Sequence, residues 1–323
     1  MGIFVLGAKT EPLFKRKNMY ILITLFSSVF LALRPIPWAK DDLNYLDYAM
    51  YGGELLQYTL ERSVTNPLFF FVNEPLWLLI NSFAGEFLQP EMVVRLVIFF
   101  STFMVLLSMG RITNYSFFTI LFFFVIVQLL KNHVTHLRQG LALGVYLTGI
   151  ALNGRKGLLV RLLSPFVHTS LWFTVLVEFY EHVTSKLRLS FFIKAALFAA
   201  LILAGIFFLP TIIQMTGDRR FTEYQFDMAQ SSSFLGFMWW FILGTLFFIG
   251  RKRNNISDLG TYGILFYLAS YFFLDFGARV FENFVPLILV SMLNSTKDFK
   301  VLFGCLMFFY GLVAWYFRGG LVF

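Results

Sequence analysis

The chain has 323 residues, of which 58% are hydrophobic and only 14% are charged. A soluble domain has roughly 25% charged residues, so this composition excludes an ordinary soluble protein. The net charge of +8 does not indicate a nucleic-acid-binding protein, because the basic residues stand in short clusters between apolar segments, as they do in membrane loops. The one cysteine, Cys305, allows no disulfide within the chain and so says nothing about the compartment.

Apolar segments that are suited to crossing or entering a bilayer recur along the whole chain. A transmembrane helix needs about 20 predominantly apolar residues, so this length allows about ten or eleven transmembrane or re-entrant helices. The pattern predicts an all-α, polytopic membrane protein that forms a single transmembrane domain over residues 1–323. The expected segments are 18–34, 91–110, 115–130, 138–153, 157–168, 169–181, 190–209, 233–250, 258–275, 280–295 and 301–317.

Basic clusters between these segments indicate the orientation. The run 15–17 precedes the first apolar segment and predicts a cytoplasmic N-terminus with an uncleaved first span. If the pairs 155–156 and 186–188 are also cytoplasmic, the segment between them crosses twice or re-enters. Pro165 lies inside this segment and removes a backbone donor, so we expect a break there, with His168 at the turn near the outer face. The alternative is one helix over 157–180, which would place the basic run 251–253 outside, against the charge rule.

Two less apolar stretches are expected to be external loops. The first, near 35–90, is acidic and rich in tyrosine, and its segment after Glu74 and Pro75 is too short for a full span, which predicts an interfacial or re-entrant helix. The second loop, over 210–233, carries Arg219 and Arg220 together with several acidic residues.

Four ionisable groups converge on the external face in this topology, namely Asp42 beside Asp41, Arg138, His168 and Arg279. Arginine binds phosphate through planar, bidentate hydrogen bonds, and a carboxylate or imidazole can accept a proton from a sugar hydroxyl. The pattern therefore favours a site that binds a lipid phosphate and activates a hydroxyl.

Each of these residues also has a structural interpretation. Asp42 could cap a helix, Arg138 could reach the lipid headgroups, His168 could satisfy a helix break, and Arg279 could pair with a nearby acid. Although two adjacent aspartates could hold a cation, no second ligand set accompanies Asp41 and Asp42, so we expect no metal and no cofactor.

Taken in order, the motifs resemble those of the EpsG-like, Wzy-type family of polysaccharide polymerases. The matching segments are Asp42-Leu43-Asn44-Tyr45, Glu74-Pro75-Leu76, Arg138-Gln139-Gly140-Leu141-Ala142 and His168-Thr169-Ser170, with Arg279 as a late arginine. The resemblance covers roughly residues 40–290. It implies a membrane glycosyltransferase related to the GT-C class, with a GT-C-like fold.

The resemblance implies polymerisation of undecaprenyl-diphosphate-linked repeat units of O-antigen or exopolysaccharide at the periplasmic face of the bacterial inner membrane. Asp42 or His168 would activate the acceptor hydroxyl, and Arg138 and Arg279 would hold the donor diphosphate. Sugar contacts are expected from Asp41, Tyr45, Glu74, Arg219 and Arg220. The implied partners are the lipid-linked glycan, the bilayer and a chain-length-regulating co-polymerase, with no nucleic acid.

Two other classes of protein need similar residues. One is another GT-C transferase that uses a lipid-linked sugar, or an O-antigen ligase. The other is a flippase for the same lipid-linked oligosaccharide, which is not an enzyme. Transporters often contain repeats, which this sequence lacks, so the polymerase is favoured over the flippase.

Overall fold

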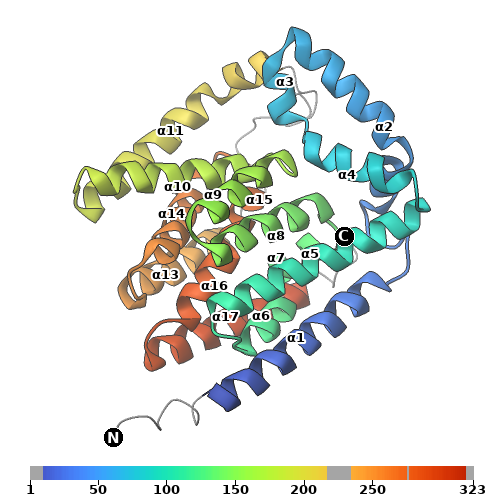
Figure 1. Ribbon diagram of the computed structural model, residues 1–323. Coiled ribbons are helices and arrows are strands. Elements are labelled where there is room, and N and C mark those ends of the chain that lie inside the picture. Colours follow the sequence, from blue (N-terminus) through green and yellow to red (C-terminus); the bar gives the residue numbers. More distant parts are fainter. Residues whose placement is uncertain (1–9, 217–233, 275, 318–323) are drawn as a thin grey trace, which may run out of the picture.

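The computed structural model describes residues 10–216, 234–274 and 276–317 and consists there of helices joined by short turns (Figure 1). The helices are α1 (Thr10–Ala32), α2 (Asp42–Thr65), α3 (Pro67–Val72), α4 (Pro75–Gly85), α5 (Pro90–Ile112), α6 (Phe118–Val125), α7 (Val127–Val134), α8 (Leu137–Leu152), α9 (Gly154–Leu163), the 3-10 turn η1 (Ser164–Phe166), α10 (Ser170–Lys186), α11 (Phe191–Thr216), α13 (Phe234–Gly250), α14 (Asn255–Ser270), α15 (Gly277–Glu282), α16 (Val285–Leu293) and α17 (Lys297–Phe317).

Three of the described helices are long and apolar enough to cross a membrane, namely α5, the Phe191–Phe208 part of α11, and α17. α5 is central, with 56% of its most apolar window buried inside the protein, whereas the corresponding value for α11 is 11%. The exposed apolar side chains of α11 therefore face lipid, since water around them would be unfavourable. These helices confirm an all-α, polytopic membrane protein.

The acidic stretch after α1, expected to be a loop, is largely helical. α2, α3 and α4 occupy it. α4 is too short to span a bilayer, as was expected for the segment after Glu74 and Pro75. The buried residues of α2 include Tyr45, Ala49 and Gly52, which recur at helical spacing and so form one face that packs on α4. A Cβ at Gly52 would lie 2.7 Å from the backbone nitrogen of Ser82, so this glycine lets the two helices approach closely.

The apolar segment 115–130, expected to be one helix, is divided at Ile126 into α6 and α7. Ile126 has an extended backbone (φ −82°, ψ 103°), which interrupts the helical hydrogen bonds. The indole of Trp315 on α17 donates a hydrogen bond to the carbonyl oxygen of Val125 over 3.0 Å, so a distant side chain satisfies a backbone group at the break.

The break expected after Pro165 is confirmed. α9 runs back along α8, the chain turns through η1 and His168, and α10 then runs in the direction of α8 (Figure 1). Glu178 of α10 joins these three helices by accepting a hydrogen bond from Tyr146 of α8 and pairing with Arg161 of α9 at 2.8 Å. With a length of about 15 Å, α9 reaches only halfway through a bilayer. The alternative of one uninterrupted helix over 157–180 is wrong.

Replacement of Gly149 by valine is expected to separate α9 from α8. A Cβ at Gly149 would lie 2.6 Å from the carbonyl oxygen of Gly157, so the added side chain must push the backbones apart. Overpacking of this kind costs about 1–3 kcal/mol, which should lower the thermal unfolding midpoint of the protein in detergent. Gly205→Val is the matched control, because a Cβ at Gly205 meets no atom within 4 Å. Equal midpoints for the two variants would contradict the close packing of α8 and α9.

Candidate functional site

The site is built around the carboxylate of Glu74, which lies just before the first turn of α4. Glu74 has a left-handed backbone (φ 54°, ψ 52°), and Pro75 occupies the first position of the helix. A left-handed conformation is uncommon for a residue other than glycine and tends to persist at functional sites, where the surrounding structure holds it. The side chain of Glu74 is 2% exposed. The turn thus aims a buried carboxylate at the neighbouring helices.

Two residues that the sequence singled out meet at this carboxylate. Arg138, in the first turn of α8, donates through Nη1 to Oε2 of Glu74 over 2.6 Å. His168, in the turn between η1 and α10, contacts Oε1 of Glu74 through Nδ1 at 2.5 Å. Thr169 also points its backbone N–H and its hydroxyl to Oε1, at 3.3 and 3.4 Å. One carboxylate therefore bridges a guanidinium from α8 and an imidazole from the turn before α10.

The contact with Glu74 fixes how the imidazole of His168 can act. An ionised carboxylate only accepts hydrogen bonds, so Nδ1 of His168 is assigned the proton that it donates to Glu74. In neutral imidazole the other nitrogen, Nε2, then carries the lone pair. This arrangement makes Nε2 the proton-accepting atom and lets the carboxylate stabilise the imidazolium that forms.

Aromatic rings of α2 and α4 support the guanidinium of Arg138. The ring of Tyr48 lies 5.2 Å from the guanidinium carbon, within the range of a cation–π contact, and its hydroxyl is 3.3 Å from Nη1. Tyr48 and Tyr45 both pack edge-on against Trp77. Tyr45 is 4% exposed, so its ring packs inside the protein against Trp77 and does not offer a face to a sugar.

A second set of hydrogen bonds links α8 and α15, which carry the two arginines, to the start of α10 just after His168. Gln139, next to Arg138, donates to the carbonyl oxygen of Arg279 over 2.7 Å and to the amide oxygen of Asn283 over 2.9 Å. The amide nitrogen of Asn283 in turn reaches the hydroxyl of Ser170 over 3.1 Å. Asn283 is fully buried. These bonds fix the spacing between α8, α15 and the start of α10.

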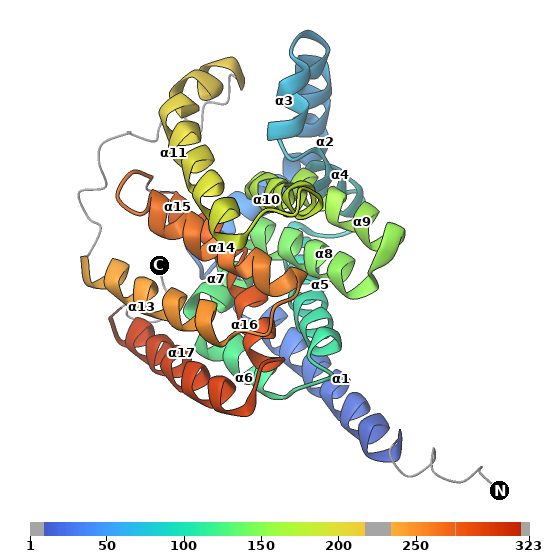
Figure 2. The same cartoon turned by 90° about the vertical axis from the view of Figure 1, so that its left-hand side faces the viewer.

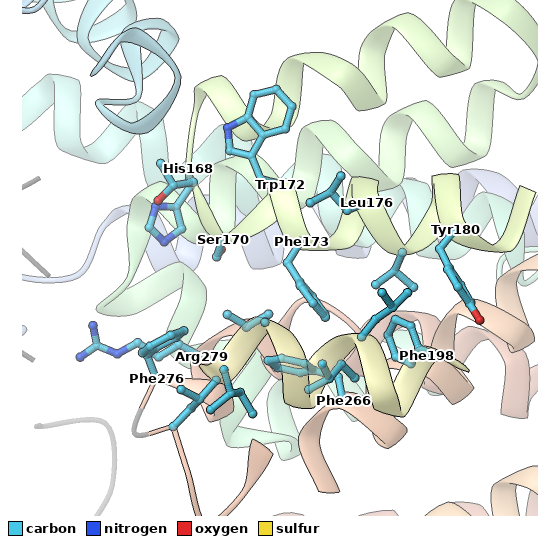
Figure 3. A pocket seen from close by; sticks show the side chains of 18 of the residues that line it. His168, Ser170, Trp172, Phe173, Leu176, Tyr180, Phe198, Phe266, Phe276 and Arg279 are labelled. Atoms are coloured by element: carbon cyan, nitrogen blue, oxygen red, sulfur yellow. The ribbon is translucent and has the colours of Figure 1, made fainter. Parts of the chain in front are cut away.

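An elongated cavity of about 660 Å³ extends from this polar cluster between α10 and α11. Arg138, His168 and Arg279 line it together with Phe173, Phe198 and other apolar side chains. Figure 3 shows His168 and Arg279 at one end of the cavity and Tyr180 at the other. The described residues that line it include no aspartate or glutamate. The cavity therefore combines a cationic end with an apolar body.

Asp42 does not join this cavity. Its carboxylate is fully buried and pairs with both terminal nitrogens of Arg34, at 2.5 and 2.6 Å, and it also accepts hydrogen bonds from the backbone N–H groups of Trp38 and Ala39. Burial alone would raise the pKa of Asp42, but the hydrogen bonds from Arg34 and the two amides outweigh it and the pKa is lowered. Such a carboxylate is a poor proton acceptor. The expected convergence of Asp42 with Arg138, His168 and Arg279 is therefore not found, and its role as a base stays a prediction.

The remaining candidate residues are placed as follows. Asp41 is half-buried at the start of α2 and makes no side-chain cap of that helix. Arg279 is exposed on α15 and lines the cavity, on the side opposite His168 in Figure 3. Arg219 and Arg220 lie outside the described residues.

Three contributors were missed from the sequence: Tyr48, Thr169 and Asn283. Tyr48 follows Tyr45 by one helical turn, and Thr169 follows His168 directly, so both could have been found from neighbouring candidates. Asn283 gives no such signal, because it reaches Ser170 only through the packing of α15 against α10.

The arrangement suits transfer chemistry on an anionic lipid. Guanidinium groups bind diphosphate oxygens well, and fixed donors of this kind stabilise negative charge as a leaving group departs. An imidazole oriented by a carboxylate can take a proton from a hydroxyl as its oxygen attacks. A charged end and an apolar body together fit a molecule with a phosphate head and a hydrocarbon tail.

Comparison with known proteins gives one match that spans nearly the entire chain. The model of the EpsG family matches residues 17–320. No curated protein and no solved structure matches the chain. The matched range contains all the helices of the site, together with the motifs at Glu74, Arg138 and His168. The chain therefore belongs to the EpsG family.

Proposed function

We propose that this protein polymerises oligosaccharide repeat units that are linked to undecaprenyl diphosphate, at the outer face of the bacterial inner membrane. The observation that carries the proposal is the bridge from Glu74 to both Arg138 and His168 at the cationic end of an apolar cavity. Membership of the EpsG family supports a polysaccharide polymerase in general. The site supports the narrower assignment to a lipid diphosphate donor.

The proposed reaction joins a growing glycan to a new repeat unit. A hydroxyl of the lipid-linked acceptor attacks the anomeric carbon of the donor, and the bond from that carbon to the diphosphate oxygen breaks. The electron pair leaves with the lipid diphosphate, and the hydroxyl proton passes to Nε2 of His168. The new glycosidic bond leaves the lengthened glycan on the acceptor lipid.

Each polar residue has a role in this step. Arg138 has five N–H donors; Nη1 donates to Glu74 and to the hydroxyl of Tyr48, and the N–H groups of Nε and Nη2 bind the diphosphate. Arg279 binds the same group from α15. Glu74 holds Arg138 and His168 in position, and the Gln139–Asn283 link keeps Arg279 at a fixed distance from Arg138.

The glycan ladder made by a deletion strain complemented with variants tests this proposal. Wild type should restore a ladder of repeat lengths, whereas Arg138→Gln should leave mainly single repeats, since loss of one such donor costs about 2.7–4 kcal/mol of transition-state stabilisation. Glutamine can still donate to Glu74, so the variant should fold. The matched control is Arg155→Gln, which removes an exposed arginine at the other end of the α8–α9 hairpin and should retain the ladder.

Other outcomes of the complementation experiment identify other functions. Single sugars added to a lipid would indicate a different GT-C transferase, and glycan joined to lipid A would indicate a ligase. Loss of the single-repeat band from the deletion strain would indicate a flippase. A full ladder from Arg138→Gln, at wild-type protein levels, would remove Arg138 from the reaction.

A further inference from the structure

The apolar body of the cavity has a shape that the transfer reaction alone does not explain. It extends away from the polar cluster, between α10 and α11, and is walled by Phe173, Val177, Phe198, Ile202 and Phe266. A glycan presents hydroxyl groups along its length, and these would lose their hydrogen bonds to water against such a wall. The apolar body therefore suits hydrocarbon and not sugar.

The two helices of the cavity meet at one end and diverge toward the other, as Figures 1 and 2 show. At the closed end the hydroxyl of Tyr180 donates to the carbonyl oxygen of Lys194 over 2.6 Å, and Lys194 pairs with Glu181 at 3.1 Å. His168 and Arg279 lie at the open end, away from Tyr180 (Figure 3), and Glu74 joins Arg138 to His168 there. From Ser170 to Tyr180 the helix rises about 15 Å. That length equals one leaflet of a hydrocarbon core roughly 30 Å thick.

The part of the cavity between α10 and α11, called the groove below, also opens sideways between these helices. Leu176 of α10 and Leu201 of α11 both line it, yet each remains 59% exposed. α11 presents most of its apolar surface outward, where a bilayer would surround it. A lipid could thus pass between Leu176 and Leu201 without leaving the hydrocarbon phase.

Gly205 of α11 keeps the groove wide. It lines the cavity, and a Cβ built on it would meet no atom within 4 Å. Glycine inside a helix costs roughly 0.5–1 kcal/mol relative to alanine, and here no close helix contact requires it. The space beside Gly205 is therefore available to a ligand and can be filled by a larger side chain without a clash.

We infer that the groove between α10 and α11 holds the prenyl tail of the lipid diphosphate, which enters sideways from the outer leaflet past Leu176 and Leu201. The inference rests on the proposed function. Charge complementarity selects the occupant, since the described lining has two arginines and a histidine at one end and no acidic residue. The diphosphate lies at these cations, the first part of the tail fills the groove, and the rest of the tail remains in the bilayer.

Photo-crosslinking of the purified full-length protein in nanodiscs tests the location. The probe is a polyprenyl diphosphate with a diazirine in the first units of its tail, and the labelled peptides are mapped by mass spectrometry. Labels are expected on the 170–180 part of α10 and the 198–206 part of α11. Unlabelled polyprenyl diphosphate should compete at least 10-fold better than polyprenol or phosphatidylglycerol.

The variant Gly205→Phe should reduce labelling at least 10-fold by filling the groove, whereas Ala204→Phe should leave it unchanged. Ala204 is the adjacent exposed residue of α11, outside the cavity lining, so it controls for added bulk. Labels on other helices, equal competition by polyprenol, or equal labelling of the two variants would overturn the inference.

A chain-elongation assay on the same preparation separates this inference from the proposed function. Diphosphate-dependent labels in the groove without any elongation would support the tail site and count against polymerisation. Elongation together with labels elsewhere would support polymerisation and overturn the tail site.

Discussion

Replacement of Glu74 by glutamine is expected to lower the rate of glycan transfer by about 10²–10⁴-fold, the contribution of a positioned general base. The glutamine oxygen can still accept from Arg138, but its amide nitrogen would face Nδ1 of His168. Nδ1 would then have to accept a hydrogen bond, which moves the ring proton to Nε2 and removes the lone pair on which the proposed proton transfer depends.

The measurement is the initial transfer rate of purified enzyme at matched concentration. Glu61→Gln is the control, because Glu61 is exposed on α2. Among the described residues, its carboxylate accepts a side-chain hydrogen bond from Gln57, one turn earlier on the same helix. Glutamine has the size of glutamate, so the unfolding midpoint should change little. A Glu74→Gln enzyme that keeps the wild-type rate would show that the carboxylate does not orient His168.

Replacement of Asp42 by alanine is expected to destabilise the protein and to leave the rate per folded molecule nearly unchanged. Removal of one partner of a buried ion pair costs about 3–5 kcal/mol, because the other charge remains buried. Here the remaining guanidinium of Arg34 would keep only its hydrogen bonds to the carbonyl oxygens of Pro35 and Val134.

The unfolding midpoint in detergent and the transfer rate, normalised to folded protein, check this result together. Asp47→Ala on the same helix removes an exposed carboxylate and should change neither quantity. A stable Asp42→Ala protein that transfers no glycan would contradict the structural role and restore Asp42 as the base.

The sequence predicted the parts of the fold that depend on local chemistry. Pro165 cannot donate a backbone hydrogen bond, and the basic clusters around it required a reversal, so the break before α10 could be predicted. The division at Ile126 could not be predicted. The backbone carbonyl of the adjacent Val125 is hydrogen-bonded by Trp315 of α17, which is distant in the sequence.

Within the site, Arg138 and His168 were identified because ionisable residues in apolar segments are costly and therefore uncommon. The central position of Glu74 was missed, since the sequence placed it in an external loop and only the left-handed turn before Pro75 aims it inward. The pairing of Asp42 with Arg34 could not be predicted, because Arg34 ends the first apolar segment and only the fold brings the two residues together.

Polymerisation by the purified protein alone tests the central claim most directly. The protein would be reconstituted in liposomes with undecaprenyl-diphosphate-linked repeat units, and glycan length and released lipid diphosphate would be measured over time. We predict glycans of several repeats, with one lipid diphosphate released for each bond formed, and none from Glu74→Gln at matched protein. Repeat units that stay single, or that only move across the bilayer, would contradict a polymerase.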